Sequence, residues 1–304
     1  MDLSDLKGVG AVTEERLSEA GVNALDELAA ASVDQLTDSG MSENKAEKLI
    51  RRASKQTVVM ETGDEVVEKL KQKQYVPSGM DVLDNYLHGG FREGHVVAVS
   101  GPSGSGKTQV SFQSLVSAVE ATGRPAVYIE TEPGRYSPTR LEQLATEDDT
   151  QSKIHRVEAH DLEQQELAYE KVKDAYEDGI EYSLIVVDSF TSNFRLSDEF
   201  EGRGQLSDRS TVIGRHINGL RDSVKTHGCP CLITAQIYGD PSGYGSPTAI
   251  YGGSLFMHSV NYILNMASDR GSLRKTKIMN HPEVAEEEVY VNITDSELES
   301  MENV

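Results

Sequence analysis

The chain has 304 residues, long enough for one large core of roughly 200–250 residues plus a small accessory domain. It carries 29 basic and 50 acidic side chains, and this formal net charge of -21 argues against a general electrostatic attraction to nucleic acid. No apolar run reaches the roughly 20 residues of a membrane span, and the first residues show no basic leader or apolar signal core. We therefore expect a cytoplasmic protein with no membrane partner.

Local basic patches interrupt the acidic background. Segment 45–55 has five basic residues against one acid, 203–225 has five against two, and 270–277 has four and no acid. An acidic surface of this kind suits a cytoplasm at very high salt, where the Debye length falls to about 3 Å at 1 M. Adaptation to high salt, a halophilic character, is therefore our hypothesis.

Residues 1–55 are predicted to form short helices joined by tight turns. Glycines 8 and 10 precede a periodic helix for which Thr13 is the expected N-cap, and Gly21 follows its end. A second unit of the same form has Gly40 before a helix capped by Ser42. Such a pair is typical of a helix-hairpin-helix domain, whose backbone N–H groups can face a DNA backbone. A helical protein-docking domain that touches no DNA is the alternative.

Residues 56–74 are predicted to be a linker and oligomerisation segment, apolar at first and then charged and helical. From residue 75 to 304 apolar strands alternate with helices, and continuous apolar strands indicate a parallel sheet covered on both faces. The expected strands are 95–100, 125–130, 183–189 and 229–236, with later strands at 260–268, 275–281 and 288–295 that could be antiparallel at one edge. Cys229 and Cys231 are too close for an ordinary disulfide and lack zinc partners, so we expect buried core residues.

A phosphate-binding loop follows the first of these strands. The spacing of Gly101, Gly106, Lys107 and Thr108 matches the P-loop pattern, with an apolar strand before it and a helix after it. In such a loop backbone N–H groups cradle phosphate oxygens, the lysine reaches the terminal phosphates, and the threonine hydroxyl ligates magnesium. A glycine-rich turn with no nucleotide role is the alternative, and the flanking elements argue against it.

Acidic residues end two other predicted strands. Asp188 ends a buried strand, where a P-loop NTPase carries its second magnesium-side group. Glu130 and Glu132 lie at the end of another, and either could orient or deprotonate the attacking water. A solvated acidic strand end without a catalytic role is the alternative for this pair.

These motifs together resemble the RadA group of the RecA family of recombinases. The resemblance runs over nearly the whole chain and rests on the segments "LKGVG", "GSGKTQ", "YIETE", "LIVVDSFTSNFR", "EGRGQLSDR", "LITAQ" and "YGGSLFMH". Of these, "GRGQLSDR" is specific, because generic P-loop ATPases lack it. The resemblance implies an α/β fold, with a RecA-like P-loop ATPase core and a mostly parallel central sheet behind a small all-α helix-hairpin-helix domain.

The resemblance also implies the roles of individual residues. Lys107, Glu132 and Gln236 would be catalytic, with Glu132 activating water and Gln236 sensing the nucleotide. Thr108 and Asp188 would hold Mg²⁺, and the family pattern allows K⁺ as an additional ion. The residues that would hold ATP, through backbone or side-chain groups, are Gly101, Pro102, Ser103, Gly104, Ser105, Gly106, Lys107, Thr108, Gln109, Arg140 and Asp188, with Arg140 against the adenine.

Two segments resemble the DNA-binding loops of the family. The first is near Arg203 and the second runs from Tyr238 to Tyr251. The implied DNA-binding residues are Arg195, Arg203, Arg209, Gly243, Tyr244 and Gly245. Aromatic faces in such a loop can stack on bases, although simple surface packing is an equal alternative for the tyrosines. The implied partners are single-stranded and double-stranded DNA, further copies of the chain in a filament or ring, and another recombinase or mediator.

The expected subunit contacts differ from the family pattern. Met60 and Gly63 stand where the family has a phenylalanine and an alanine that enter the neighbouring subunit. Ser246 lies where the family has an aspartate that caps the neighbour's ATP. His258 occupies a position that links the second loop to nucleotide across the boundary, or is a purely structural histidine.

Two further differences concern ATP turnover and the second DNA loop. Pro133 follows Glu132 where the family has glycine, and a proline stiffens that turn. The second loop is also a few residues shorter. We therefore expect an ATP-dependent recombinase that forms filaments on single-stranded DNA and exchanges strands, or a paralogue that binds ATP and DNA or another recombinase and assists loading. A P-loop ATPase that regulates a process without DNA is a third, less consistent reading.

Overall fold

The computed structural model describes residues 3–58, 60–197, 206–238 and 249–301. The chain divides into two compact units, residues 1–72 and 73–304. Each unit has its own hydrophobic core. The loop residues Arg203, Gly243, Tyr244 and Gly245 and the expected contact residue Ser246 lie outside the described residues.

The first unit is helical. Its elements are η1 (Leu3–Asp5), α1 (Ala11–Glu19), α2 (Leu25–Ala30), α3 (Val33–Asp38), α4 (Glu43–Thr57) and α5 (Gly63–Lys71). The leucines Leu17, Leu28, Leu36 and Leu49 fill a core among the first four helices. Ser42 occupies the N-cap position of α4, as predicted, but its side chain makes no capping hydrogen bond.

The predicted start of the first long helix is wrong. Gly10, in extended conformation, is the N-cap of α1, so the helix begins two residues before Thr13. Thr13 is buried, and its hydroxyl accepts a hydrogen bond from Lys45 Nζ at 2.6 Å. The threonine therefore joins α1 to α4 instead of capping a helix end.

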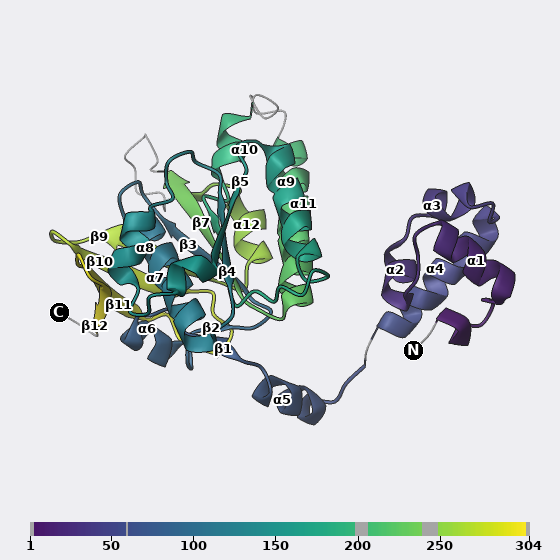
Figure 1. The fold of residues 1–304 in the computed structure, drawn as a ribbon, viewed down its shortest axis with the longest axis horizontal. Coiled ribbons are helices and arrows are strands. Elements are labelled where there is room, and N and C mark those ends of the chain that lie inside the picture. Colours follow the sequence, from purple (N-terminus) through teal and green to yellow (C-terminus); the bar gives the residue numbers. More distant parts are fainter. Residues whose placement is uncertain (1–2, 59, 198–205, 239–248, 302–304) are drawn as a thin grey trace. The chain divides into compact units, whose positions relative to one another are not determined.

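The second unit is built on one large, mostly parallel sheet (Figure 1). The parallel strands are, in spatial order, β9 (Tyr262–Ser268), β3 (Val96–Gly101), β7 (Cys231–Tyr238), β6 (Ile185–Asp188), β4 (Ala126–Glu130) and β5 (Ile154–Glu158). Beyond β9 the sheet continues with the antiparallel strands β10 (Leu273–Met279), β11 (Glu288–Ile293) and β12 (Leu298–Met301). The expected antiparallel edge is present, although β9 itself runs parallel to β3. Short strand β8 (Ala249–Ile250) pairs with β7, and β1 (Tyr75–Val76) pairs with β2 (Phe91–Arg92).

Helices cover both faces of this sheet. One face packs against α6 (Asp81–Tyr86), α7 (Lys107–Thr122) and α8 (Pro138–Leu144), with η2 (Thr150–Lys153) beside them. The other packs against α9 (Leu162–Asp174), α10 (Ser192–Leu196), α11 (Leu206–His227) and α12 (Gly253–Ser259). Successive residues of β3 enter opposite cores: Val97 and Val99 the first, Val96 and Ala98 the second. This alternation explains why the strand reads as a continuous apolar run.

Both cysteines lie in the second of these cores, as expected. Cys229 and Cys231 are fully buried and free. Burial raises the pKa of the Cys229 thiol to about 12 and that of Cys231 well above its ordinary value. Within the described part of the chain no cluster of side chains suits a metal ion through His, Cys, Asp or Glu alone. These cysteines therefore act as small core residues.

Candidate nucleotide-binding site

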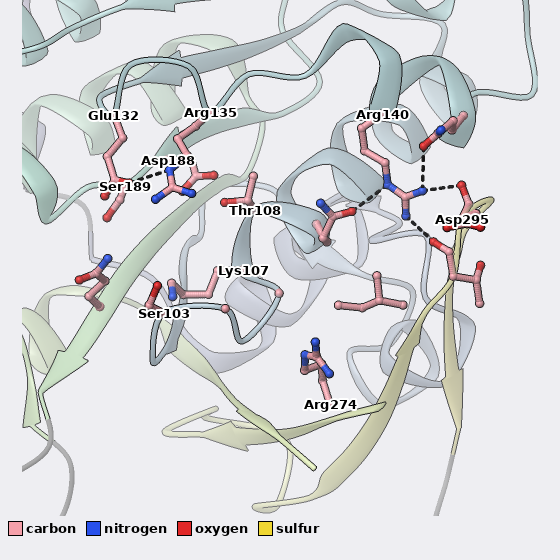
Figure 2. A pocket seen from close by; sticks show the side chains of 17 residues that line it. Ser103, Lys107, Thr108, Glu132, Arg135, Arg140, Asp188, Ser189, Arg274 and Asp295 are labelled. Carbon is pink, nitrogen blue, oxygen red and sulfur yellow. Dashed lines mark hydrogen bonds and ion pairs between the residues drawn. The ribbon is translucent and has the colours of Figure 1, made fainter. Parts of the chain in front are cut away.

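A cavity of about 530 Å³ opens where the parallel strands end (Figure 2). Carboxyl ends of parallel strands meet at one edge of a sheet, and ligands of open α/β sheets bind there. The lining residues come from the P-loop, from the ends of β4, β6 and β7, from α8 and from the antiparallel strands. They are Ser103, Gly104, Gly106, Lys107, Thr108, Gln109, Glu132, Arg135, Arg140, Gln143, Asp188, Ser189, Gln236, Arg274, Ile293, Thr294 and Asp295.

The P-loop joins β3 to α7 in the manner that its sequence predicts. At Gly106, which has φ +96°, an added Cβ would lie 2.7 Å from Ile293 Cδ1, and at Gly101 it would lie 2.4 Å from the Met266 carbonyl oxygen. Only glycine fits these two positions. The first N–H groups of α7 therefore remain available to an anion. Gly101, Pro102 and Ser105 belong to this loop without lining the cavity.

Lys107 provides the positive charge of the loop. It is 8% exposed, and its ammonium donates to the carbonyl oxygens of Gly101 at 3.0 Å and Pro102 at 2.8 Å. Burial lowers the pKa of Lys107, and the negative charges of Asp188 and Glu132 oppose that effect. A buried cation held only by neutral carbonyls is poised to bind a phosphate.

Asp188 is held in a fixed orientation at the end of β6. Its two carboxylate oxygens accept hydrogen bonds from Tyr128 Oη at 2.9 Å and Thr234 Oγ1 at 2.5 Å. Asp188 and Thr108 line the same cavity. Their oxygens, together with phosphate oxygens, make up the kind of ligand set that Mg²⁺ prefers. Tyr128 and Thr234, on neighbouring strands, carry no motif that could have revealed this supporting role.

The structure separates the two glutamates that the sequence left as alternatives. Glu130 is fully buried and lies outside the cavity; its carboxylate accepts hydrogen bonds from the N–H groups of Arg135 at 2.6 Å and Tyr136 at 2.9 Å, and pairs with Arg156. Burial by itself raises the pKa of Glu130, but these hydrogen bonds outweigh it and hold the pKa below its ordinary value. Glu132 lines the cavity, and its carboxylate contacts Arg135 Nε at 3.0 Å. Of the two glutamates, only Glu132 therefore faces the cavity.

Arg140, on α8, forms part of the cavity wall. Its guanidinium donates to Gln109 Oε1 at 2.7 Å, to the Thr294 carbonyl at 2.8 Å and to the Asp295 carbonyl at 2.5 Å, as Figure 2 shows. The planar group is thus held against the end of β11. The sequence had not indicated Arg274, Ile293, Thr294 or Asp295 as lining residues, because the sheet topology alone brings them to the P-loop.

Gln236 connects the cavity to an arginine predicted to bind DNA. Gln236 lies two residues before the end of β7 and lines the cavity, and its side-chain oxygen accepts a hydrogen bond from Arg195 of α10. Tyr251 donates its N–H to the Gln236 carbonyl and its hydroxyl to the Phe194 carbonyl. Arg209 of α11 lies over the Tyr251 ring, 4.8 Å from its centroid. Of the arginines predicted to bind DNA, Arg195 thus contacts the cavity-lining Gln236 directly and Arg209 contacts it through Tyr251.

Three of the residues expected at subunit contacts belong to the described part of the chain. Met60 is 97% exposed, and Gly63 is the first residue of α5, where Thr62 and Glu65 form a capping box. His258 is exposed in the last turn of α12. His258, which belongs to the same unit as the cavity, does not line it.

A P-loop at the end of a central parallel strand, an acid on a nearby strand end and an antiparallel extension of the sheet define a RecA-like nucleotide-binding core. A family model described as Rad51 matches residues 70–301, and one described as a SAM-like helix-hairpin-helix tandem matches residues 1–55. The chain belongs to the Rad51 family and is of the RadA type. This confirms the resemblance and the fold class that the motifs indicated.

Several relatives bear the name DNA repair and recombination protein RadA. The protein of Methanococcus voltae is 31% identical over 317 residues, which cover 97% of this chain and 98% of the relative. That of Methanococcus maripaludis strain C5 is 32% identical, covering 96% and 97%. That of Methanoculleus marisnigri is 29% identical, covering 95% of each chain. No helix within the described ranges is long and apolar enough to cross a membrane.

Proposed function

We propose that this protein is an ATP-dependent recombinase that assembles on single-stranded DNA and promotes strand exchange in DNA repair. ATP and Mg²⁺ would occupy the cavity, with K⁺ as an additional ion that the family pattern allows. The residues fit these groups: Lys107 and the N-terminus of α7 suit phosphate, and Thr108 and Asp188 offer oxygen ligands to the metal. The bound metal would neutralise charge on the transferred phosphoryl group.

Within this site the chain's own residues divide the work. Lys107 binds the terminal phosphates, and Arg140 lies against the adenine. The Glu132 carboxylate accepts a proton from the attacking water at one of its oxygens, and Gln236 reports whether the terminal phosphate is present. Positioning and electrostatic stabilisation supply most of the catalysis in phosphoryl transfer.

The hydrogen bond between Arg195 and Gln236 is the observation that supports coupling to DNA. Gln236 is two residues from the end of β7, which leads into segment 239–248, and Arg195 lies on α10, which leads into segment 198–205. A hydrogen bond therefore joins two described residues that each lie three positions before one of these segments in the sequence. A γ-phosphate that attracts the Gln236 amide changes the partner of Arg195, and in this way ATP would control the grip on DNA.

The helical unit would add a second DNA contact. Helix α4 exposes the basic side chains of Lys48, Arg51, Arg52 and Lys55. Because the chain as a whole is acidic, such a local patch is where a phosphate backbone can bind. The exposed Met60 would insert into a neighbouring copy during assembly.

Measuring ATP hydrolysis with and without single-stranded DNA tests this proposal directly. We expect DNA to stimulate hydrolysis and ATP to strengthen DNA binding, and Lys107→Ala to abolish both effects. Electron microscopy with DNA and ATP at high salt should show long filaments, and Met60→Glu should shorten them. Equal DNA binding with and without ATP, with no self-association, would refute the proposal.

One observation favours the alternative of a loading paralogue with slow turnover. The Glu132 carboxylate is paired through Oε2 with Arg135, in the turn that contains Pro133, so this ion pair occupies one of its two oxygens and restrains the side chain. Rings or short oligomers in place of long filaments, together with binding to a second recombinase, would support this alternative.

A further inference from the structure

Arg274 is a cation in the cavity wall whose role nothing above explains. It belongs to the basic segment 270–277 and lies on β10. Lys275 and Lys277 of the same strand form ion pairs with Glu288 at 2.7 Å and Glu286 at 2.5 Å. Side chains alternate along a strand, so Arg274 is on the opposite face from these lysines. Figure 2 shows it pointing from its strand into the cavity.

Arg274 lacks a counter-ion among the residues that the structure describes. One guanidinium nitrogen donates to two neutral carbonyls of its own turn, Gly271 at 2.7 Å and Leu273 at 3.0 Å. No carboxylate of the described chain lies within 4.0 Å of it, and its Nε–H is buried without a hydrogen-bond partner. Arg135 and Arg140, which line the same cavity, both have partners. Arg274 is therefore oriented by its turn and, within the described chain, has no carboxylate to neutralise its charge.

The position of Arg274 indicates which part of a nucleotide it faces. Its Cγ lies 3.7 Å, and Ile293 Cδ1 2.7 Å, from the point where a Cβ on Gly106 would stand. Ile293 leads into Thr294 and Asp295, whose carbonyls hold Arg140 at the end of the cavity that we assign to adenine. Arg274 thus lies between the P-loop turn and the nucleoside end.

We propose that Arg274 is a phosphate-binding residue of this site, whose guanidinium donates to an oxygen of the α- or β-phosphate. Because ATP and ADP both have these two phosphates, the contact would strengthen the binding of both nucleotides equally. A contact to the terminal phosphate of ATP would strengthen the binding of ATP alone. An arginine donor and a phosphate oxygen form a strong, charge-assisted hydrogen bond. This inference rests on the proposed ATP site.

The test compares the affinities of ADP, a non-hydrolysable ATP analogue and adenosine, measured by displacement of a fluorescent ADP analogue. We expect Arg274→Gln to weaken ADP and the ATP analogue by the same factor, about tenfold to a hundredfold, and to leave adenosine unchanged. Arg274→Lys, which keeps the charge, should recover part of the loss. Lys275→Gln, on the neighbouring position with the opposite orientation, is the matched control and should bind like the wild type.

The possible failures are distinguishable. Wild-type affinity in Arg274→Gln would overturn the inference, and so would an equal loss for adenosine and ADP, which indicates a structural role. Thermal unfolding without nucleotide shows whether each variant is folded. If Arg274→Gln does not fold, the test uses Arg274→Lys and compares its ratio of ADP affinity to adenosine affinity with that of the wild type. An unchanged ratio would overturn the inference. If the wild type bound no nucleotide, the proposed function itself would fail. Binding that Lys107→Ala abolishes and Arg274→Gln retains would overturn the role of Arg274 alone.

Discussion

Glu130→Gln and Glu132→Gln should impair the protein in different ways. Glu130 is buried and accepts hydrogen bonds from two backbone N–H groups and from Arg156, so the amide would place N–H donors against existing donors. Hydrogen bonds to a charged group contribute about 1.5–3 kcal/mol, and we expect a loss of about 2 kcal/mol, at the lower end because Arg156 is partly exposed. For a core of this size that loss corresponds to a fall of about 4–8 °C in Tm.

Glu132→Gln should instead leave the stability nearly unchanged. The pair of Glu132 with Arg135 lies near the surface, with side chains 21% and 56% exposed, and such pairs contribute about 0–1 kcal/mol. ATP hydrolysis should fall by about a hundredfold to ten-thousandfold, the usual contribution of a general base, while nucleotide binding persists.

Thermal unfolding and ATP hydrolysis, both measured for the two variants, test this difference. Hydrolysis is assayed well below the lower Tm, so that both variants are folded, and Glu130→Gln should then turn over ATP at close to the wild-type rate. Loss of hydrolysis in Glu130→Gln with an unchanged Tm, or normal hydrolysis in Glu132→Gln, would refute the assignment. The pKa of Glu130 is held below its ordinary value of 4.5, so its stabilisation is complete above that pH and is lost as the pH falls further.

Three other predictions follow from the structure. Arg195→Ala should weaken binding to single-stranded DNA and reduce the stimulation of hydrolysis by DNA, with ADP affinity unchanged, because the link to Gln236 is lost. A parallel loss of ADP affinity would contradict this coupling. Burial among aromatic rings lowers the pKa of His216 to about 4 from 6.5, so the unfolded chain binds the extra proton between these values. The free energy of unfolding should therefore increase with pH between these values, by about 1.4 kcal/mol per pH unit from this group, and denaturant titrations of His216→Phe should lack that part of the slope. The net charge of -21 predicts a Tm that rises toward molar KCl, and equal stability at low salt would exclude salt adaptation.

The nucleotide site illustrates how far local sequence can lead. The P-loop and Asp188 were predictable because a strand, a glycine turn and a helix start are specified by neighbouring residues, and the structure places both at one cavity. The N-cap at Ser42 was predictable for the same reason. The prediction of Thr13 as an N-cap was wrong because its hydroxyl accepts a hydrogen bond from Lys45, which is distant along the chain, and this contact could not be read from the neighbouring residues.

By itself the sequence determined the family, the alternation of apolar strands and helices in the core, and the loop that suits phosphate, whereas β5, which is buried only at alternate positions, was not predicted. Only the tertiary structure decided which glutamate faces the cavity, because the strand ends at Glu130, which is buried, and the following turn places Glu132 in the cavity wall. It also decided that Arg274 and Ile293 join the P-loop, since they come from antiparallel strands that β9 connects to β3. These contacts depend on strand pairing and side-chain direction across long separations, which no local pattern encodes.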